Sequence, residues 1–296
     1  MWLLLALTSA VCFGLRGICY HWTSKKQLDR NLTLFGVFAS GAVGSLALTL
    51  LTGQQWTPAV LTGLMMGLFS FAANASLFKG FAVGKSSLIA IMSGLPPVVV
   101  VILAYALWGE TLTAGQWVAF ALIVTGILVV RYSDDLRKGG LQGLQWGVLV
   151  MMFFGLNDMS GKLSTRLHAD LFPTLTLMFI MGSVCFGGWW LLGNRKRKLE
   201  QETEPGHQPN HVQANGWTPR RTFFTGMLIG LTNLCGMVLI VSAFRTGVTG
   251  LVSAVVALNI LMILLYTHVF VKEKLRPTEW SGVALAVGGI LVLQLA

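Results

Sequence analysis

Three residues of this sequence place an ionisable or strongly polar side chain inside an apolar stretch. Arg16 lies within the first long apolar stretch, and Asn157 and Asp158 lie together within a later one. Ionisable groups are costly in hydrocarbon and mark ion or substrate pathways there. A guanidinium and a carboxylate at the same depth can bind a charged solute, and the carboxyl group can carry a proton. We therefore place all three residues in a candidate substrate or proton pathway.

Two structural roles compete with this hypothesis. Arg16 and Asp158 could form a static ion pair that joins two parts of the protein. Alternatively, Asp158 could pair with Lys162, which follows one helical turn later in the same stretch. The residue types alone leave these alternatives open.

Three further asparagines and two prolines lie in apolar stretches. We add the asparagines to the candidate pathway, although an asparagine in a membrane helix equally serves as a hydrogen bond between helices. Adjacent prolines remove backbone donors, so we predict a helix break there, with its irregular backbone facing protein or water rather than lipid. These residues are Asn74, Asn233, Asn259, Pro96 and Pro97.

The composition identifies the lipid bilayer as the solvent of this chain. Apolar residues make up 54 % of it and charged residues 11 %, whereas soluble domains carry about 25 % charged residues. The net charge of +10 is spread over short loops, which argues against a nucleic-acid partner. The cysteines lack metal-binding spacing, and His207 and His211 lack a third ligand, so we expect no metal site. No nucleotide-binding or catalytic pattern occurs, so we expect neither an enzyme nor a cofactor.

Ten apolar stretches are long enough to cross a bilayer as helices, which takes about 20 residues each. They are continuous apolar runs rather than alternating strands, and only helices or closed barrels satisfy backbone polar groups in lipid. The predicted fold is an all-α polytopic membrane protein with ten transmembrane helices. The spans lie at approximately 2–22, 31–52, 59–79, 86–107, 113–131, 143–162, 172–193, 222–243, 249–270 and 278–295. Small residues permit close helix packing in lipid, a role that we assign to Gly36, Gly41, Gly44, Gly282, Gly288 and Gly289.

The chain repeats much of its own sequence. Residues 63–130 align without a gap with residues 226–293, and a weaker match aligns Arg16 with Asn157. Two hydrophobic halves of this kind are typical of secondary transporters, whose site lies between the repeats near the bilayer midplane. We predict two five-helix repeats at 1–132 and 143–296. The second includes a polar loop at 194–221, which we expect to be mobile.

Positive charge is unevenly distributed over the connections between spans. All but four of the 21 Lys and Arg residues fall in loops after odd-numbered spans, the exceptions being Arg16, Lys162, Arg166 and Arg245. Because basic loops stay in the cytoplasm, both termini are predicted to lie outside it. The basic loops follow the first and third spans of the first half but the second and fourth of the second half, so we predict inverted repeats.

Each half ends in the same pattern of a Glu, a short polar link, an aromatic residue and a Gly-rich apolar span. The two copies are Gly109-Glu110-Thr111-Leu112 through Trp117 to Gly126-Ile127-Leu128, and Lys272-Glu273-Lys274-Leu275 through Trp280 to Gly288-Gly289-Ile290. We expect both glutamates to cap the helix that follows. With Pro96-Pro97 ahead of the first copy, this pattern resembles the EamA-type repeat of the drug/metabolite transporter superfamily, over nearly the whole chain.

The resemblance implies a ten-helix transporter with a central cavity lined by spans 1, 3, 4, 6, 8 and 9, with spans 5 and 10 at the periphery. Members of the family export amino acids, metabolites or drugs, and some import nutrients. Their usual orientation, with both termini in the cytoplasm, is opposite to the one that the charges predict here.

We therefore expect a secondary active transporter in the cell membrane that moves a small metabolite or drug-like solute by alternating access, as a proton-coupled exporter. The alternatives are a nutrient importer or facilitator, and a flippase for a lipid-linked group, which would need a lateral opening lined by apolar side chains. The expected partners are membrane lipid, a small-molecule substrate and protons, with the oligomeric state left open.

Overall fold

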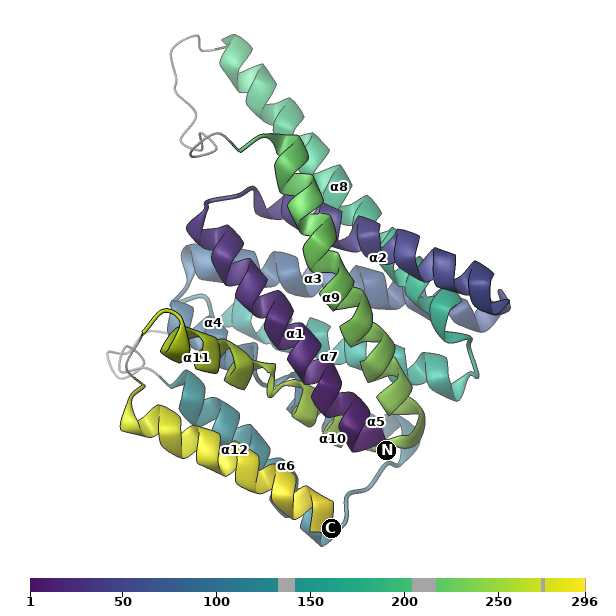
Figure 1. Ribbon diagram of the computed structural model, residues 1–296, viewed down its shortest axis with the longest axis vertical. Helices are drawn as coiled ribbons and strands as arrows, with labels where there is room; N and C mark the ends of the chain where they lie inside the picture. Colours follow the sequence, from purple (N-terminus) through teal and green to yellow (C-terminus); the bar gives the residue numbers. More distant parts are fainter. Residues whose placement is uncertain (133–141, 204–216, 273–274, 296) are drawn as a thin grey trace.

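A computed structural model describes residues 1–132, 142–203, 217–272 and 275–295, and helices without strands make up the regular structure of this described part. The helices pack side by side into one bundle (Figure 1). In chain order they are α1 (Trp2–Lys25), α2 (Arg30–Thr52), the short 3₁₀ helix η1 (Pro58–Leu61), α3 (Thr62–Val83), α4 (Ser86–Met92), α5 (Pro96–Trp108), α6 (Ala114–Arg131), α7 (Leu144–Arg166), α8 (Leu171–Thr203), α9 (Pro219–Thr246), α10 (Thr249–Val256), α11 (Asn259–Val269) and α12 (Pro277–Leu295).

The two ends of the bundle differ. Both chain termini lie at one end, which we call the terminal end (Figure 1). The α9–α10 connection lies there too, because Gly247 packs against Trp2 at the start of α1. At the opposite end, which we call the basic end, lie the last residues of α1, α3, α6, α8 and α11 (Figure 1). There α8 and the start of α9 project beyond the other helices.

The predicted all-α polytopic membrane fold is confirmed. Nine helical stretches in the described part of the chain are long and apolar enough to cross a membrane. Helix α7 is not among them, although it has 23 residues and packs against α3 and α5 inside the bundle. Its polar residues explain the difference: they include Asn157, Asp158 and Lys162, and Lys162 is only 8 % exposed.

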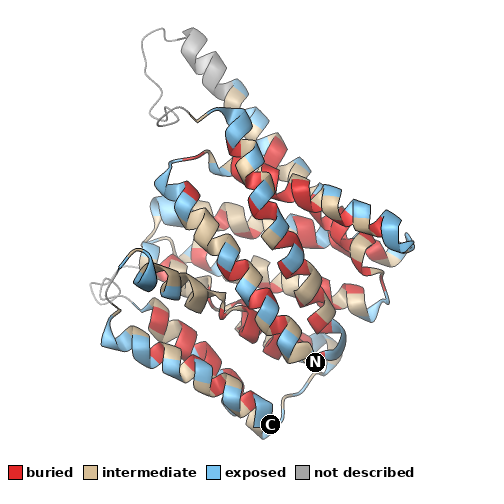
Figure 2. Ribbon diagram, viewed as in Figure 1, coloured by how far each residue is buried: buried red, intermediate tan, exposed pale blue. Residues whose placement is uncertain are grey.

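The outer faces of the helices carry many large apolar side chains. Exposed residues run along the outside of the bundle (Figure 2), and many of them are large and hydrophobic, such as Leu50, Val184 and Leu228. The interior is filled by other apolar side chains, of which Phe179, Phe244 and their neighbours are fully buried. A helix bundle that is apolar on both faces is suited to lipid rather than water.

Two membrane crossings consist of broken helices. The break expected from Pro96 and Pro97 falls at residues 93–95, and α5 begins at Pro96. Proline fits the first turn of a helix, because the N–H that it lacks would have no partner within the helix. A second break, at Ala257 and Leu258 between α10 and α11, was not predicted. The repeat carried the signal for it, since Asn259 aligns with Pro96 and likewise begins a helix.

The polar loop predicted at 194–221 is shorter than expected. Helix α8 continues through Thr203, and α9 begins at Pro219. Residues 194–203 are rich in Arg, Lys, Leu, Glu and Gln, which are favourable helix formers and extend α8 beyond its apolar part. The predicted mobility, together with His207 and His211, concerns residues 204–216, which lie outside the described residues.

Glycines set the contact between α6 and α12, which lie along each other at the edge of the bundle (Figure 1). A side chain at Gly289 would meet Ile123 at 2.7 Å and the carbonyl oxygen of Ala119 at 3.0 Å. By contrast, a side chain at Gly288 would meet nothing within 4 Å. The packing role predicted for Gly288 is therefore wrong. The other five predicted glycines do lie at close contacts: Gly36, Gly41, Gly44, Gly282 and Gly289.

Neighbouring glycines of α12 provide a matched pair of substitutions. We expect Gly289→Leu to lower the free energy of unfolding by about 1–3 kcal/mol, the usual cost of overpacking. Gly288→Leu should cost little, because its side chain meets open space. Thermal unfolding of both variants in detergent would measure the difference. Equal destabilisation by the two substitutions would contradict this account of the α6–α12 contact.

Candidate functional site

A cavity of about 300 Å³ lies among the helices of both halves of the chain. Its wall includes α1, α3, α7 and α9, together with the broken crossings at residues 93–97 and 253–259. All eight candidate residues identified from the sequence contribute to this lining: Arg16, Asn74, Pro96, Pro97, Asn157, Asp158, Asn233 and Asn259. Residues that are far apart in the sequence thus face one internal space.

The helices that line the cavity differ in part from those that the resemblance implied. Leu34 and Phe38 of α2 and Met178 of α8 also contribute. Helix α6, expected at the periphery, contributes Arg131, since this last residue of the helix extends its long side chain inward. The cavity lining contains no residue of the described part of α12.

Arg16 joins α1 to α9 rather than to the acid on α7. Its Nη1 donates a hydrogen bond to Oδ1 of Asn233, a side chain that is 2 % exposed. The guanidinium also lies over the ring of Phe13, 4.5 Å from its centroid, a favourable cation–π arrangement. No ion pair joins Arg16 to Asp158 within the described residues, so the static pair suggested by the sequence is not formed here.

Asp158 faces a serine on the other broken helix. Its Oδ2 accepts a hydrogen bond of 2.6 Å from Oγ of Ser253, near the end of α10. Ser253 was not identified from the sequence, because one serine in an apolar helix has no distinguishing feature. The proposed pairing of Asp158 with Lys162 is also not formed, since Lys162 contacts Glu110 instead.

Two of the asparagines behave differently from Asn233. The side chain of Asn74 donates to the carbonyl of Ser70, 2.7 Å away in the same helix, and this bond does not link two helices. Oδ1 of Asn157 is buried without a hydrogen-bond partner in the described structure. Such an orphaned buried acceptor is unusual, and here it belongs to a cavity-lining residue.

Arg131 holds the first helix break. Its Nη1 donates to the carbonyl oxygen of Ala90 and, at 2.5 Å, to Oγ of Ser93. Its Nε is buried without a partner among the described residues. Arg131 was predicted to be a loop charge because it ends an apolar span. Only the fold shows that its side chain turns into the cavity wall.

A buried ion pair lies near the terminal end of the bundle. Nζ of Lys162 lies 3.5 Å from Oε1 of Glu110 and donates to the carbonyl oxygens of Phe244 and Gly247 at 2.8 and 3.0 Å. Glu110 also accepts hydrogen bonds from the backbone N and the hydroxyl of Thr249, at 2.9 and 3.0 Å. The network connects α7, the α5–α6 link and the start of α10.

This network corrects the capping role predicted for Glu110. The following helix, α6, is capped by Thr113 and Gln116 in a capping box. Glu110 instead satisfies the first backbone N–H of α10, a helix of the other half. The equivalent Glu273 lies outside the described residues.

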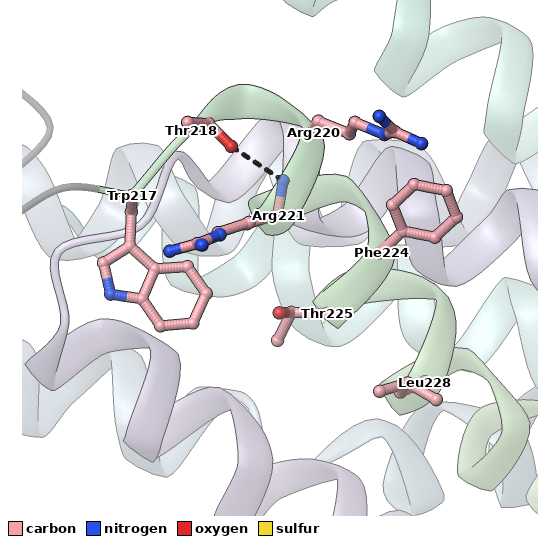
Figure 3. Close-up of a pocket in the computed structure, with 7 residues that line it drawn as sticks. All are labelled: Trp217, Thr218, Arg220, Arg221, Phe224, Thr225 and Leu228. Carbon is pink, nitrogen blue, oxygen red and sulfur yellow. Dashed lines mark hydrogen bonds between the residues drawn. The ribbon is translucent and has the colours of Figure 1, made fainter.

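Another hollow, of about 650 Å³, lies at the start of α9 near the basic end (Figure 3). Thr218 caps the helix by accepting a hydrogen bond from the backbone N of Arg221, and the Arg220 guanidinium lies 5.7 Å from the Phe224 ring centroid. Arginines beside aromatic residues are typical anchors at a membrane–water interface. None of the residues that line this hollow also lines the central cavity.

Comparisons with known proteins identify the family of this fold. The model of the EamA-like transporter family matches residues 1–132 and 141–295. No curated protein matches the chain. A solved structure described only as a crystal structure of a protein aligns with a TM-score of 0.70, covering 99 % of this chain and 96 % of that chain at 14 % identity. At that identity the likeness concerns the fold alone.

Proposed function

The chain belongs to the EamA-like transporter family and is a multi-pass membrane transporter of small solutes, and we propose that its solute crosses through the central cavity by alternating access. The observation that carries this proposal is the cavity itself. It brings polar side chains of both halves together beside two broken helices. Broken membrane helices are tolerated where they line a cavity, and transporters bind their solutes at such breaks.

Packing between the halves supports an inverted-repeat arrangement. A side chain at Gly63 would meet the carbonyl oxygen of Thr174, and one at Gly226 would meet the carbonyl oxygen of Thr33. Gly63 aligns with Gly226 in the sequence repeat, as Thr33 does with Thr174. The two contacts are therefore exchanged by the repeat, as a pseudo-twofold axis between residues 1–132 and 143–296 requires. Rocking of one half against the other would then expose the cavity alternately.

Asp158 is the proposed proton carrier. It is the acid in the cavity lining, and no cation pairs with it among the described residues. A carboxyl group at this depth must be protonated, solvated or paired during each cycle, because an isolated charge in the membrane is costly. Proton binding at Asp158 would thereby be coupled to the state of the cavity.

We propose export as the direction, with the basic end in the cytoplasm. The cavity lining reaches Arg131 at the basic end, while the buried Lys162–Glu110 network, outside that lining, joins elements near the terminal end. Arg131 and Lys162 belong to helices rather than to loops. Most of the other basic residues lie, in sequence, in or after the C-terminal parts of α1, α3, α6, α8 and α11. The positive-inside rule assigns the end of the bundle where these helices end to the cytoplasm.

Cysteine labelling from outside intact cells tests this orientation. With the native cysteines replaced, we expect Thr57→Cys in the α2–α3 connection to react with an impermeant maleimide. Lys26→Cys at the other end of α2 should react only after the cells are opened. Both positions are exposed, so they form a matched pair. The reverse pattern would place both termini in the cytoplasm.

Two other functions remain candidates for the same cavity. A nutrient importer or facilitator would use the same site with net flow inward. A flippase would need a lateral opening, and an apolar hollow of about 740 Å³ does lie between α2, α3, α7 and α8. That hollow shares no lining residue with the central cavity, which favours a solute that enters from water.

Purified protein reconstituted into liposomes tests the proposed function directly. The liposomes would be loaded with a small-molecule extract, and an inward proton gradient would be imposed. We expect selective loss of particular solutes from the interior, detected by mass spectrometry and accelerated by the gradient. Solute loss no faster than from protein-free liposomes would contradict transport. Solute loss at the same rate with and without the proton gradient would contradict proton coupling.

A further inference from the structure

We propose that the central cavity selects a small organic anion with an apolar body, whose negative group is bound by Arg16 and Arg131. The proposal rests on the proposed function, because it names the class of solute that the same cavity takes.

The charges that line the cavity do not balance. Its basic and acidic side chains are the guanidinium groups of Arg16 and Arg131 and the single carboxyl group of Asp158. The other buried charges nearby do not correct the difference, because Lys162 and Glu110 neutralise each other outside the cavity lining. An excess positive charge in a membrane-embedded space is costly unless an anion offsets it. A bound anionic solute supplies that compensation.

The two arginines also have hydrogen-bonding capacity to spare. A guanidinium carries five N–H donors in a planar fork. The described bonds of Arg16 occupy one nitrogen, which donates to Asn233. The described hydrogen bonds of Arg131 use Nη1 alone, which leaves its Nη2 without a partner in the described structure. Arginine binds carboxylates with two parallel hydrogen bonds, so these free donors fit a carboxylate or a similar oxyanion.

The remaining lining is suited to an apolar body. Four aromatic residues from three helices line the cavity: Phe13, Tyr20, Phe38 and Phe154. Ligand sites of this kind combine an apolar wall with a few polar groups that fix orientation. A cationic solute would add a third positive charge opposite one carboxylate, and Asp158 already accepts a hydrogen bond from Ser253. The lining therefore favours an amphipathic anion over a cation.

Thermal unfolding of the purified protein with matched probes tests the proposal. The probes are acetate, benzoate, phenylacetate and indole-3-acetate, each with its neutral amide and with phenethylamine as the cation. A ligand that binds only the folded protein raises its unfolding temperature. We expect at least one aromatic acid to stabilise the protein while its amide and the amine do not. Stabilisation by amides equal to that by acids, greater stabilisation by the amine, or no response to any acid would overturn the proposal.

Substitutions test which side chains bind the acid. Arg16→Gln and Arg131→Gln should each raise the half-saturating concentration of the acid about 10-fold or more, the value of a charge-assisted hydrogen bond. Arg245→Gln, an exposed arginine outside the cavity, should leave it unchanged. Asp158→Asn, which removes the negative charge, should bind the acid at least as tightly as the unmodified protein. Weaker binding by Asp158→Asn would contradict the charge argument even if both arginine variants failed to fold.

Binding and transport are separable in these experiments. Gradient-driven solute loss from liposomes without any acid-specific stabilisation would refute the anion proposal and leave the transporter in place. Acid-specific stabilisation without solute movement would support the anion site and contradict the proposed transport.

Discussion

Replacing Asp158 with Asn is expected to abolish gradient-driven solute movement while sparing exchange of the same solute at equilibrium. Asn keeps the size of the side chain and can still accept the hydrogen bond from Ser253. It cannot bind and release a proton, however, so the proton gradient would no longer be coupled to the cycle. Measured in proteoliposomes, gradient-driven loss should fall to the rate seen without a gradient, and isotope exchange should persist.

A matched control for this variant is Asp29→Asn. Asp29 caps α2 at the basic end, outside the cavity lining, and Asn is an equally good capping residue. This control should therefore retain the full response to the gradient. An unchanged gradient response in Asp158→Asn would remove Asp158 from the proton pathway. Loss of exchange together with coupling would instead indicate that Asp158 is required for binding or folding.

Lys162→Met is expected to lower the free energy of unfolding by about 3–5 kcal/mol, because it leaves the charge of Glu110 buried without its cation. The two side chains are 10 % and 17 % exposed, so water screens the remaining charge poorly. The backbone carbonyls of Phe244 and Gly247 lose a donor as well. Reversible unfolding in mixed detergent micelles would measure the change.

A second substitution separates charge from packing. In the double variant Lys162→Met with Glu110→Gln, the unpaired charge is gone and Gln can still accept the bond from the Thr249 backbone. We expect the double variant to be more stable than Lys162→Met alone. Arg245→Gln, an exposed arginine near the same end, should change stability little. If the double variant is no more stable than the single one, the cost does not come from the unpaired charge of Glu110.

Much of the fold could be predicted from the sequence because each span is recognisable on its own. A helix in lipid satisfies its own backbone, so length and hydropathy identify it without knowledge of its neighbours. Helix α7 is the exception. Its hydropathy does not identify it as a membrane span, because it contains polar residues that include Asn157, Asp158 and Lys162.

The faces of the helices could not be assigned in this way. Lipid and protein interior are both apolar, so hydrophobic periodicity does not distinguish outward from inward positions. Gly288 and Gly289 are adjacent and identical in type, yet one meets open space and the other packs against α6. Arg131 was counted as a loop charge for a similar reason. The inward direction of its side chain depends on how α6 is rotated in the bundle.

By itself the sequence determined that this is a helical membrane protein and which polar residues are costly enough to need an explanation. That followed from local chemistry, because a charged or amide side chain in hydrocarbon is unfavourable whatever surrounds it. Only the tertiary structure decided the partners: Asn233 for Arg16, Ser253 for Asp158 and Thr249 for Glu110. Each pair joins residues that are at least 95 positions apart in the chain. Such contacts depend on the packing and rotation of whole helices, which no local pattern in the sequence specifies.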